Sequence, residues 1–380
     1  MQRRKFLTLI GGGVVLAAGG ASAFVATRTP TEALAPWDAA GAAQYDDPRL
    51  HALSYAVLAP NPHNRQPWKV KLRGAEAFEL YFDTDRQLPH TDPFDRQLTI
   101  GLGCFLELME MAANSVGFAV ATELFPAGHD PAALDRRPVA HVTFSGAATS
   151  ADPLFAYALQ RRSTKQPYDT TRPVPRDVLQ RAMSAVRIAQ AGGSTEAELT
   201  QYLRDLTEQA LLIEIETPHT YKESVDLFRI GKAEVNANPD GISFSGPMFE
   251  SLRLAGVLSR ETVTDPSSVA YRGGIDAVTT NCRTSMGHIW LVTETNTRLD
   301  QIAVGRDWLR LNLATTREGL GLHPMSQALQ EYPEMAALYA DAHRRLAPDG
   351  GTVQMLGRIG YGPTVPASPR WPIEAKLVSD

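Results

Sequence analysis

Residues 161–165 read RRSTK and gather enough charge and hydrogen-bonding capacity to hold a phosphorylated ligand. The five residues carry two guanidiniums, two hydroxyls and an ammonium. Because arginine can bind phosphate oxygens through two parallel hydrogen bonds, this spacing predicts a phosphate site. A solvated basic patch is the alternative, and the hydroxyls between the charges favour phosphate.

A second segment, residues 60–68, reads PNPHNRQPW and presents several polar groups on a stiff loop. Prolines bracket a row of amide, imidazole and guanidinium groups, and an indole follows. Proline fixes its own φ angle, which limits how the loop can rearrange. We therefore expect this loop to form part of a ligand site.

A third segment lies near the C-terminus and reads GRIGYGPTVPASPRWP from residue 357 to residue 372. Its glycines at 357, 360 and 362 allow close backbone approach to another group. Arg370 lies between two prolines on a stiff tail. By itself this segment is a weak indication of function.

The sequence predicts no metal site. Its conspicuous histidines lack the spacing of metal-binding motifs, and its aspartate cluster lacks the glycine and the terminal glutamate of a calcium loop, so that turn formation explains the aspartates better. These residues are His63, His219, His288 and His323, and Asp83, Asp85, Asp92 and Asp95.

The elements that must position these segments follow a pattern that occurs twice. Two helical stretches, apolar at helical spacing, each lie between glycines 16 residues apart (101 and 117, 305 and 321). Strand-like runs flank them, at 78–82 and 139–144 in the first case and at 289–292 and 353–361 in the second. This favours two α+β units, each a helix-covered, mostly antiparallel sheet; chance similarity is the alternative.

The bulk properties are those of an ordinary globular protein with a small-molecule site. A chain of 380 residues accommodates two domains. Its net charge of −5 gives no electrostatic reason to expect nucleic acid as a partner. Of its two cysteines, Cys104 lies in an apolar helical pattern, so a core position is favoured over a disulfide with Cys282.

The N-terminus, residues 1–30, has the organisation of an export signal. Arg3 and Arg4 precede an apolar run at 9–20, and Ala21-Ser22-Ala23 offers a cleavage site. The paired arginines are similar to those of a twin-arginine signal, which predicts contact with that export machinery, a periplasmic or otherwise exported protein, and no stable membrane insertion after cleavage. A Sec signal or an uncleaved membrane anchor is the alternative.

The rest of the chain divides into three parts, the last of which contains a long insertion. We predict a linker at 31–46, a first half at 47–150 and a second half at 151–380. Within the second half, residues 221–285 are punctuated by Gly, Pro and Ser and lack clear periodicity. Such a long segment is usually functional, and we interpret it as a lid.

Three segments together resemble the nitroreductase family: RRSTKQPYD its flavin-phosphate motif, APNPHNRQPW its Ser-Ser-x-Asn-x-Gln-Pro-Trp loop, and GLGLHPMSQ its turn at the flavin ring. More narrowly the chain resembles the Acg subfamily, in which two units are fused. The resemblance spans about residues 48–373. It implies a nitroreductase-like fold and an intrachain pseudo-dimer with one complete FMN site, for which a monomer would be sufficient.

The resemblance also implies a set of FMN contacts. The FMN phosphate would bind the basic segment and the tail arginine. The proline-rich loop would face the flavin ring and the ribityl chain, and Gln66 and Trp68 would brace this loop from behind. The turn would offer backbone donors to the ring. Two departures are Asn61 and Pro62, which replace serines, and Ser326, which replaces an acidic residue. The implied contacts are Arg161, Ser163, Lys165 and Arg370; Pro60, Asn61, Pro62, Asn64 and Gln66; and Met325, Ser326 and Gln327.

Two functions are compatible with these features. The favoured one is an exported FMN oxidoreductase that passes electrons from a reduced small-molecule donor to a nitro, quinone or similar acceptor. The alternative is an FMN-storage protein, which the long insertion and the distance from cytoplasmic NAD(P)H would suit. The resemblance identifies no catalytic side chain.

Overall fold

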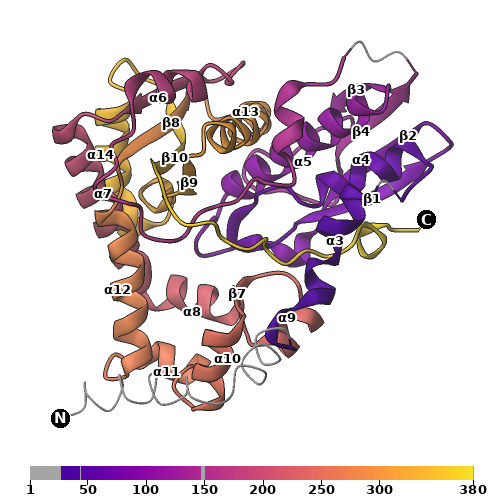
Figure 1. Ribbon diagram of the computed structural model, residues 1–380. Helices are drawn as coiled ribbons and strands as arrows, with labels where there is room; N and C mark the ends of the chain where they lie inside the picture. The colour runs from indigo at the N-terminus through magenta and orange to yellow at the C-terminus, as the bar shows by residue number, and fades with distance from the viewer. Residues whose placement is uncertain (1–26, 43, 147–149, 380) are drawn as a thin grey trace.

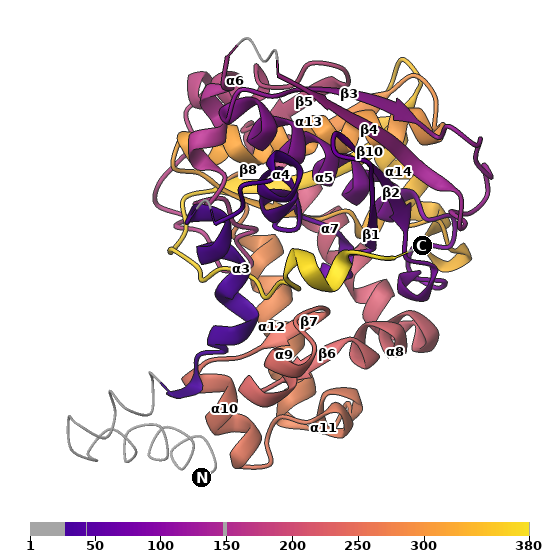
Figure 2. The same ribbon diagram turned by 90° about the vertical axis from the view of Figure 1, so that its right-hand side faces the viewer.

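The computed structural model describes residues 27–42, 44–146 and 150–379, which form two α+β halves and an inserted subdomain (Figures 1 and 2). The predicted export signal, apart from residues 27–30, lies outside the described residues. Within the described ranges, no helix combines the length and apolarity needed to cross a bilayer.

The first half consists of α4 (Pro48–Ala56), β1 (Trp68–Arg73), β2 (Ala77–Phe82), α5 (Arg96–Ser115), β3 (Ala119–Leu124) and β4 (Pro138–Ser145). The second half consists of α6 (Arg176–Met183), β5 (Gln190–Ser194), β8 (Gly287–Thr293), α13 (Arg298–Arg317), β9 (Gly321–Pro324), α14 (Ala336–Leu346) and β10 (Thr352–Gly360). The segment before the basic residues 161–165 forms a short 3-10 turn, η4 (Pro153–Tyr157).

The two halves have the same topology. The first sheet has the strand order β1-β2-β4-β3 and the second the order β5-β8-β10-β9. Every pairing within these two sheets is antiparallel, and in each half the long helix separates the second strand from the third. This confirms the predicted α+β class with two fused units.

The halves meet where α5 crosses α13, and glycines make that crossing possible. A Cβ on Gly305 would lie 2.0 Å from the Ile100 carbonyl oxygen, and one on Gly103 would lie 2.2 Å from that of Ile302. Both helices have 20 residues, and both glycines stand seven residues after the helix start. Our sequence alignment, which paired Gly101 with Gly305, was therefore wrong by two positions.

The end of the second long helix also differs from the prediction. Gly117 follows α5 with φ of +88°, as expected for a glycine that terminates a helix. After α13 the residue with positive φ is Gly319 (+70°), whereas Gly321 begins β9. Gly321 is required there for a different reason, because Tyr168 packs against its Cα.

Arginines at the starts of the two central helices fasten each half to the other. Arg96 of α5 donates to the Gln354 carbonyl oxygen in the second half at 2.7 Å. Arg298 of α13 donates to Oγ1 of Thr99 in the first half at 3.0 Å. Both side chains are buried, so these bonds replace water that the guanidiniums have lost.

The predicted linker at 31–46 contains a helix instead, α3 (Thr31–Gly41). Its buried residues Ala33, Trp37 and Ala40 are spaced for one helical face. Nε1 of Trp37 donates to the carbonyl oxygen of Ser368 in the C-terminal tail at 2.8 Å. The helix is therefore packed against the folded body rather than linking to it loosely.

The predicted lid is a subdomain with a core of its own, inserted between β5 and β8. After α7 (Ala197–Glu216) it comprises α8 (Pro218–Asp226), β6 (Phe228–Ile230), α9 (Lys232–Ala237), β7 (Ile242–Phe244), α10 (Pro247–Leu254) and α11 (Arg260–Thr264), and α12 (Val269–Arg283) returns to the second half (Figure 1). Val225, Phe228, Ile230, Leu258 and Val263 form its core.

The tail after β10 leaves the second half and runs back to the first (Figure 2). Leu377 forms a parallel bridge with Val70 of β1. Nζ of Lys376 donates to the carbonyl oxygen of Gln66 at 2.9 Å. Residues 370–377, which we assigned to the second half, thus contact the first.

Candidate functional site

The basic segment, the start of the proline-rich loop and the tail meet at one backbone carbonyl. Nη2 of Arg161 donates to the carbonyl oxygen of Leu58 at 2.9 Å. Nη2 of Arg370 donates to the same oxygen at 3.1 Å and to that of Ala59 at 3.2 Å. Folding therefore brings together three segments that are far apart in the sequence.

The arginines at this junction form a cluster of positive charge. Among the described residues, Arg161, Arg162 and Arg370 form no ion pair with a carboxylate. The Nε atom of each is buried without a hydrogen-bond partner. Since buried charges are costly unless paired, the cluster is built to receive an anion.

The pKa values of these arginines reflect the missing counter-charge. Burial, and then the charge of Arg162, lowers the pKa of Arg161 to about 10. Burial and the charges of Arg161 and Arg162 lower the pKa of Arg370 well below its ordinary value. An anion bound here would oppose both effects, because it favours the charged form of each guanidinium.

The proline-rich loop is strained and firmly held. His63, Asn64 and Gln66 have φ of 47°, 52° and 50°, a left-handed region that non-glycine residues rarely adopt. The amide N–H of Gln66 donates to Oδ1 of Asn61 at 2.7 Å, and its Nε2 donates to the carbonyl oxygen of Pro239 at 2.6 Å. Strain maintained by surrounding bonds is common at functional sites.

Two of the predicted FMN-contact residues, Gln66 and Asn64, hold neighbouring groups of the protein in place. Gln66 is fully buried, and its Oε1 accepts from the backbone N–H of Trp371 at 2.9 Å. Oδ1 of Asn64 accepts from Nη1 of Arg370 at 2.6 Å, which orients that guanidinium. Pro60, Asn61 and Pro62 remain half-buried at the surface of the loop.

The predicted ring-contact turn lies beside the basic segment, because the N–H of Thr164 donates to the carbonyl oxygen of Leu322 at 3.0 Å. The N–H of Met325 already donates to the Leu356 carbonyl oxygen at 2.8 Å. The expectation that Met325 offers a free backbone donor is therefore wrong, since β10 uses it. Ser326 is buried, and Oε1 of Gln327 is buried without a partner.

Lys165 lies at the centre of a group of titratable side chains. It has exposed surface, yet the protein around it lowers its pKa by desolvation, as expected for a group lining a recess. Burial and the charge of Lys165 lower the pKa of His63 to about 4. Burial, Arg358 and Lys165 lower the pKa of His323, and Glu214 of α7 also interacts with Lys165. The nearby Ser163 is half-buried.

Sequence reasoning missed three residues of this site. Oδ1 of Asn312 on α13 accepts from Nη1 of Arg161 at 3.0 Å. The ring of Trp37 on α3 lies 4.7 Å from the guanidinium of Arg162 and 5.8 Å from that of Arg370. Glu214 is the third. The apolar spacing of 33, 37 and 40 would have revealed the helix that carries Trp37, had 31–46 not been interpreted as a linker.

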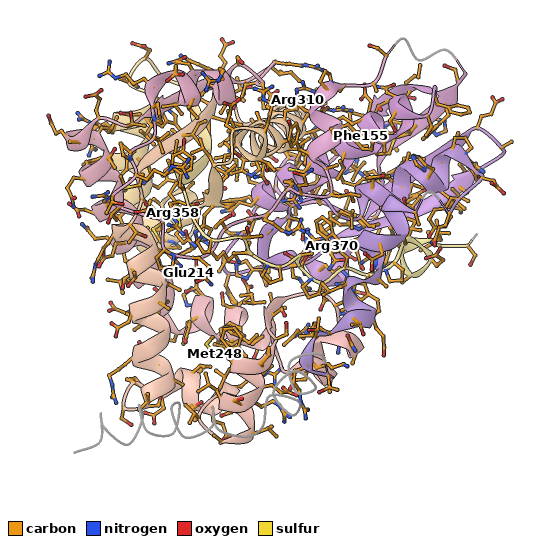
Figure 3. The ribbon with its side chains drawn as sticks, viewed as in Figure 1. Phe155, Glu214, Met248, Arg310, Arg358 and Arg370 are labelled. Carbon is orange, nitrogen blue, oxygen red and sulfur yellow. The ribbon has the colours of Figure 1, made fainter. Side chains whose placement is uncertain are left out.

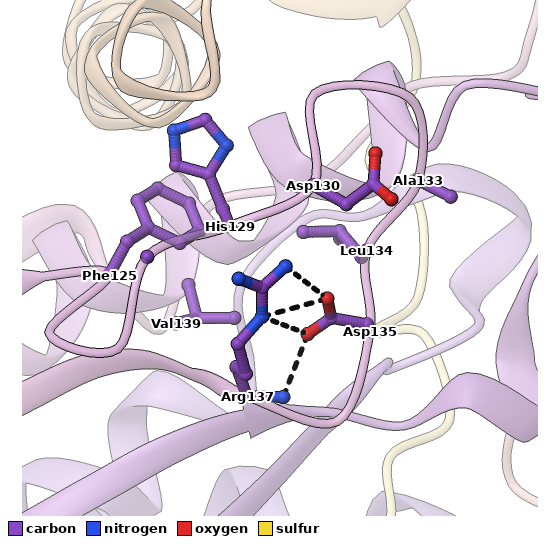
Figure 4. Close-up of a pocket in the computed structure, with 9 residues that line it drawn as sticks. Phe125, His129, Asp130, Ala133, Leu134, Asp135, Arg137 and Val139 are labelled. Carbon is purple, nitrogen blue, oxygen red and sulfur yellow. Dashed lines mark hydrogen bonds and ion pairs between the residues drawn. The ribbon is translucent and has the colours of Figure 1, made fainter.

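One hollow lies outside this constellation, and another borders it at Trp37 and Arg162. The one in Figure 4, between β3 and β4, has a volume of about 10 Å³, which is room for one water molecule. There Arg137 pairs with Asp135. The other, of about 400 Å³, lies beside α3 and is lined by Thr31, Leu34, Trp37, Asp38, Leu159, Arg162 and Ala367.

The chain is similar in sequence to curated proteins of Mycobacterium tuberculosis. No protein-family description matches the chain. Over 327 residues it is 28% identical to a candidate NAD(P)H nitroreductase of Mycobacterium tuberculosis, covering 84% of this chain and 87% of that protein. The candidate NAD(P)H nitroreductase Acg of the same organism is 32% identical over 120 residues, 31% of this chain and 34% of Acg.

Among solved structures, the FMN-dependent nitroreductase NfnB of Mycobacterium smegmatis, in complex with NADPH, aligns with 58% of this chain and 95% of its own. The identity is 16% and the TM-score 0.33. The strand pairing of this chain by itself shows the two α+β units.

Proposed function

We propose that this chain is an FMN-dependent oxidoreductase of the nitroreductase type, acting between a small-molecule electron donor and a small-molecule acceptor. The observation that carries the proposal is the arginine cluster without a counter-ion, at the junction of basic segment, loop and tail. The sequence similarity to proteins named as NAD(P)H nitroreductases supports the redox class.

The residues present suit FMN. Arg161 and Arg370 would bind its phosphate, with their unpaired Nε atoms available as further donors, and the hydroxyl of Ser163 lies on the same segment. Lys165 and the half-buried residues of the proline-rich loop would face the remainder of the cofactor. When bound, FMN supplies hydride and electron transfer.

We propose one FMN per chain. In the second half, the connection from α6 to β5 is short, and the carboxylate of Asp307 binds the backbone N–H groups of Arg187, Ile188 and Ala189 at 2.7–2.8 Å. This connection has no Gln-Pro-Trp sequence and already has a buried anion of its own. Both features support a single FMN site per chain.

The visible spectrum of the purified protein tests this proposal. We expect a yellow protein that releases one FMN per chain on denaturation and that is bleached anaerobically by both NADPH and dithionite. A colourless protein that does not bind added FMN would contradict the proposal. Two FMN molecules per chain would contradict only the stoichiometry.

FMN storage is the second candidate, and the contacts of the inserted subdomain favour it. The N–H of Gly241 donates to the Asn64 carbonyl oxygen at 3.2 Å, and Arg86 pairs with Asp240 of the subdomain. On the other side, Oδ1 of Asn236 accepts from the N–H of Ala33 of α3 at 3.2 Å. Bleaching by dithionite but not by NADPH would support storage or a different donor.

We also propose that the protein is exported through the twin-arginine pathway. The supporting features are Arg3 and Arg4, the short apolar run and the Ala-Ser-Ala segment. Replacing Arg3 and Arg4 together by lysine should retain the protein in the cytoplasm of a bacterium with a working twin-arginine pathway. Fractionation with an immunoblot measures this, and unchanged export of the variant would contradict the proposal.

A further inference from the structure

Besides the arginine cluster, the site contains a buried carboxyl group on α7. This group belongs to Glu214, which is labelled in Figure 3. Oε2 of Glu214 accepts from Nε2 of Gln330 at 2.9 Å, and Oε1 accepts from Oγ of Ser224 at 3.4 Å. Gln330 directly follows η5 (Gln327–Leu329), so the carboxyl group is fixed against the predicted ring-contact turn.

Three charged or titratable groups from different elements face Glu214. They are Lys165 from the basic segment, Glu223 from α8, and Tyr332 from the segment after η5. Lys165 favours the carboxylate, whereas Glu223 disfavours it. Burial outweighs both and raises the pKa of Glu214 to about 7. At neutral pH a substantial fraction of Glu214 therefore carries a proton, unlike an ordinary carboxyl group.

Residues that interact with Glu214 or Lys165 carry polar atoms without partners. Among the described residues, Oε1 of Gln330 and the hydroxyl of Tyr332 are buried and have no hydrogen-bond partner. Oδ1 of Asn281 is also unpaired, while Nδ2 of the same side chain donates to the Lys165 carbonyl oxygen at 3.4 Å. Since buried polar atoms are usually satisfied, these atoms are available to bind a polar ligand.

We propose that Glu214 is the proton donor for a quinone that binds beside Lys165. The inference rests on the proposed oxidoreductase function. Reduction of a quinone to the hydroquinone takes up one hydride equivalent, which originates in a reduced nicotinamide, and one proton. The O–H bond of Glu214 breaks, a new O–H bond forms on the quinone oxygen, and water reprotonates the carboxylate.

Lys165 and Tyr332 have supporting roles in this scheme. The ammonium of Lys165 stabilises the negative charge that develops on the quinone oxygen before the proton arrives. The unpaired hydroxyl of Tyr332 can donate to the other oxygen of the quinone. Burial of Glu214 matters because a general acid works best when its pKa lies near the working pH.

A comparison of two electron acceptors tests the proposal. The flavin-loaded protein is reduced anaerobically with dithionite and mixed rapidly with benzoquinone or with ferricyanide, which accepts an electron but no proton. We expect Glu214→Gln to slow reoxidation by benzoquinone about 100-fold and to leave the rate of reoxidation by ferricyanide unchanged. Glu208→Gln, on the same helix but paired with Arg283 at the surface, should affect neither.

The pH dependence adds a second criterion. In the wild type, reoxidation by benzoquinone should become slower as the pH rises through about 7, because Glu214 must be protonated. The Glu214→Gln variant should lack this decline. If Glu214→Gln slows both acceptors equally, or leaves the benzoquinone rate unchanged, the role of Glu214 is structural and the inference is overturned.

The protonation of Glu214 can also be measured without turnover. Because its folded pKa of about 7 lies above the ordinary 4.5, the folded state binds the extra proton, and stability should fall as the pH rises between these values. In FMN-free protein the urea midpoint of the wild type should therefore decrease, as the pH rises, relative to the midpoint of Glu214→Gln. A difference between the two urea midpoints that stays constant with pH would contradict a protonated Glu214. A protein that binds no FMN would instead contradict the proposed function.

Discussion

Replacing Arg161 by alanine should weaken FMN binding about 10- to 100-fold. This range follows from the roughly 1.5–3 kcal/mol that a hydrogen bond to a charged group contributes. Arg161 is buried, lacks a carboxylate partner among the described residues, and contacts both Asn312 and Leu58. Fluorescence titration of FMN-free protein measures the affinity, since bound and free flavin differ in emission.

Arg172→Ala is the matched control for this prediction. Arg172 is exposed and stacks on the ring of Tyr361 at 3.3 Å, outside the arginine cluster. Its loss should leave FMN affinity unchanged. FMN should also raise the melting temperature of the wild type and of Arg172→Ala more than that of Arg161→Ala, because at a given concentration a ligand that binds more tightly stabilises the folded state more. Equal affinities in the two variants would remove Arg161 from the phosphate site.

Replacing Gly305 by alanine should destabilise the fold by about 3 kcal/mol or more, since an added methyl group in a packed core forces backbone displacement. The new Cβ would lie 2.0 Å from the Ile100 carbonyl oxygen and 2.7 Å from Cα of Gly103. These are backbone atoms, which cannot rotate away. Because the crossing of α5 and α13 joins the halves, FMN affinity should fall as well.

Gly273→Ala, which also changes a glycine inside a helix, should have the opposite effect on stability. Gly273 lies inside α12, and a Cβ there would meet open space. Alanine is favoured over glycine in a helix by roughly 0.5–1 kcal/mol, so this variant should be slightly more stable. Urea midpoints measure both changes. If Gly305→Ala is as stable as Gly273→Ala, the helices can separate without cost and the crossing is not tightly packed.

The sequence located the segments of the candidate site well. RRSTK, PNPHNRQPW and the tail with Arg370 are local patterns, recognisable because arginine forks and prolines have intrinsic chemistry that needs no context. The repeat was also visible, since helical periodicity and flanking strands are local properties. Its register was not, because the choice between Gly101 and Gly103 depends on which backbone approaches α13.

The tertiary structure decided which polar groups already have hydrogen-bond partners and which have none. The N–H of Met325 proved to belong to the sheet, Gln66 to brace the loop, and residues 31–41 to form a helix beside the arginines. Glu214 resembled any helical glutamate until burial and Gln330 distinguished it.

The physical reason is that residue type fixes which bonds a side chain can make. The sequence by itself therefore determined the segments proposed to bind phosphate, the two α+β units and the absence of a Gln-Pro-Trp loop in the second unit. Burial, close approach and the lack of a counter-charge depend on segments far apart in the chain. Only the fold could bring Arg161 and Arg370 to the Leu58 carbonyl and leave their Nε atoms unpaired.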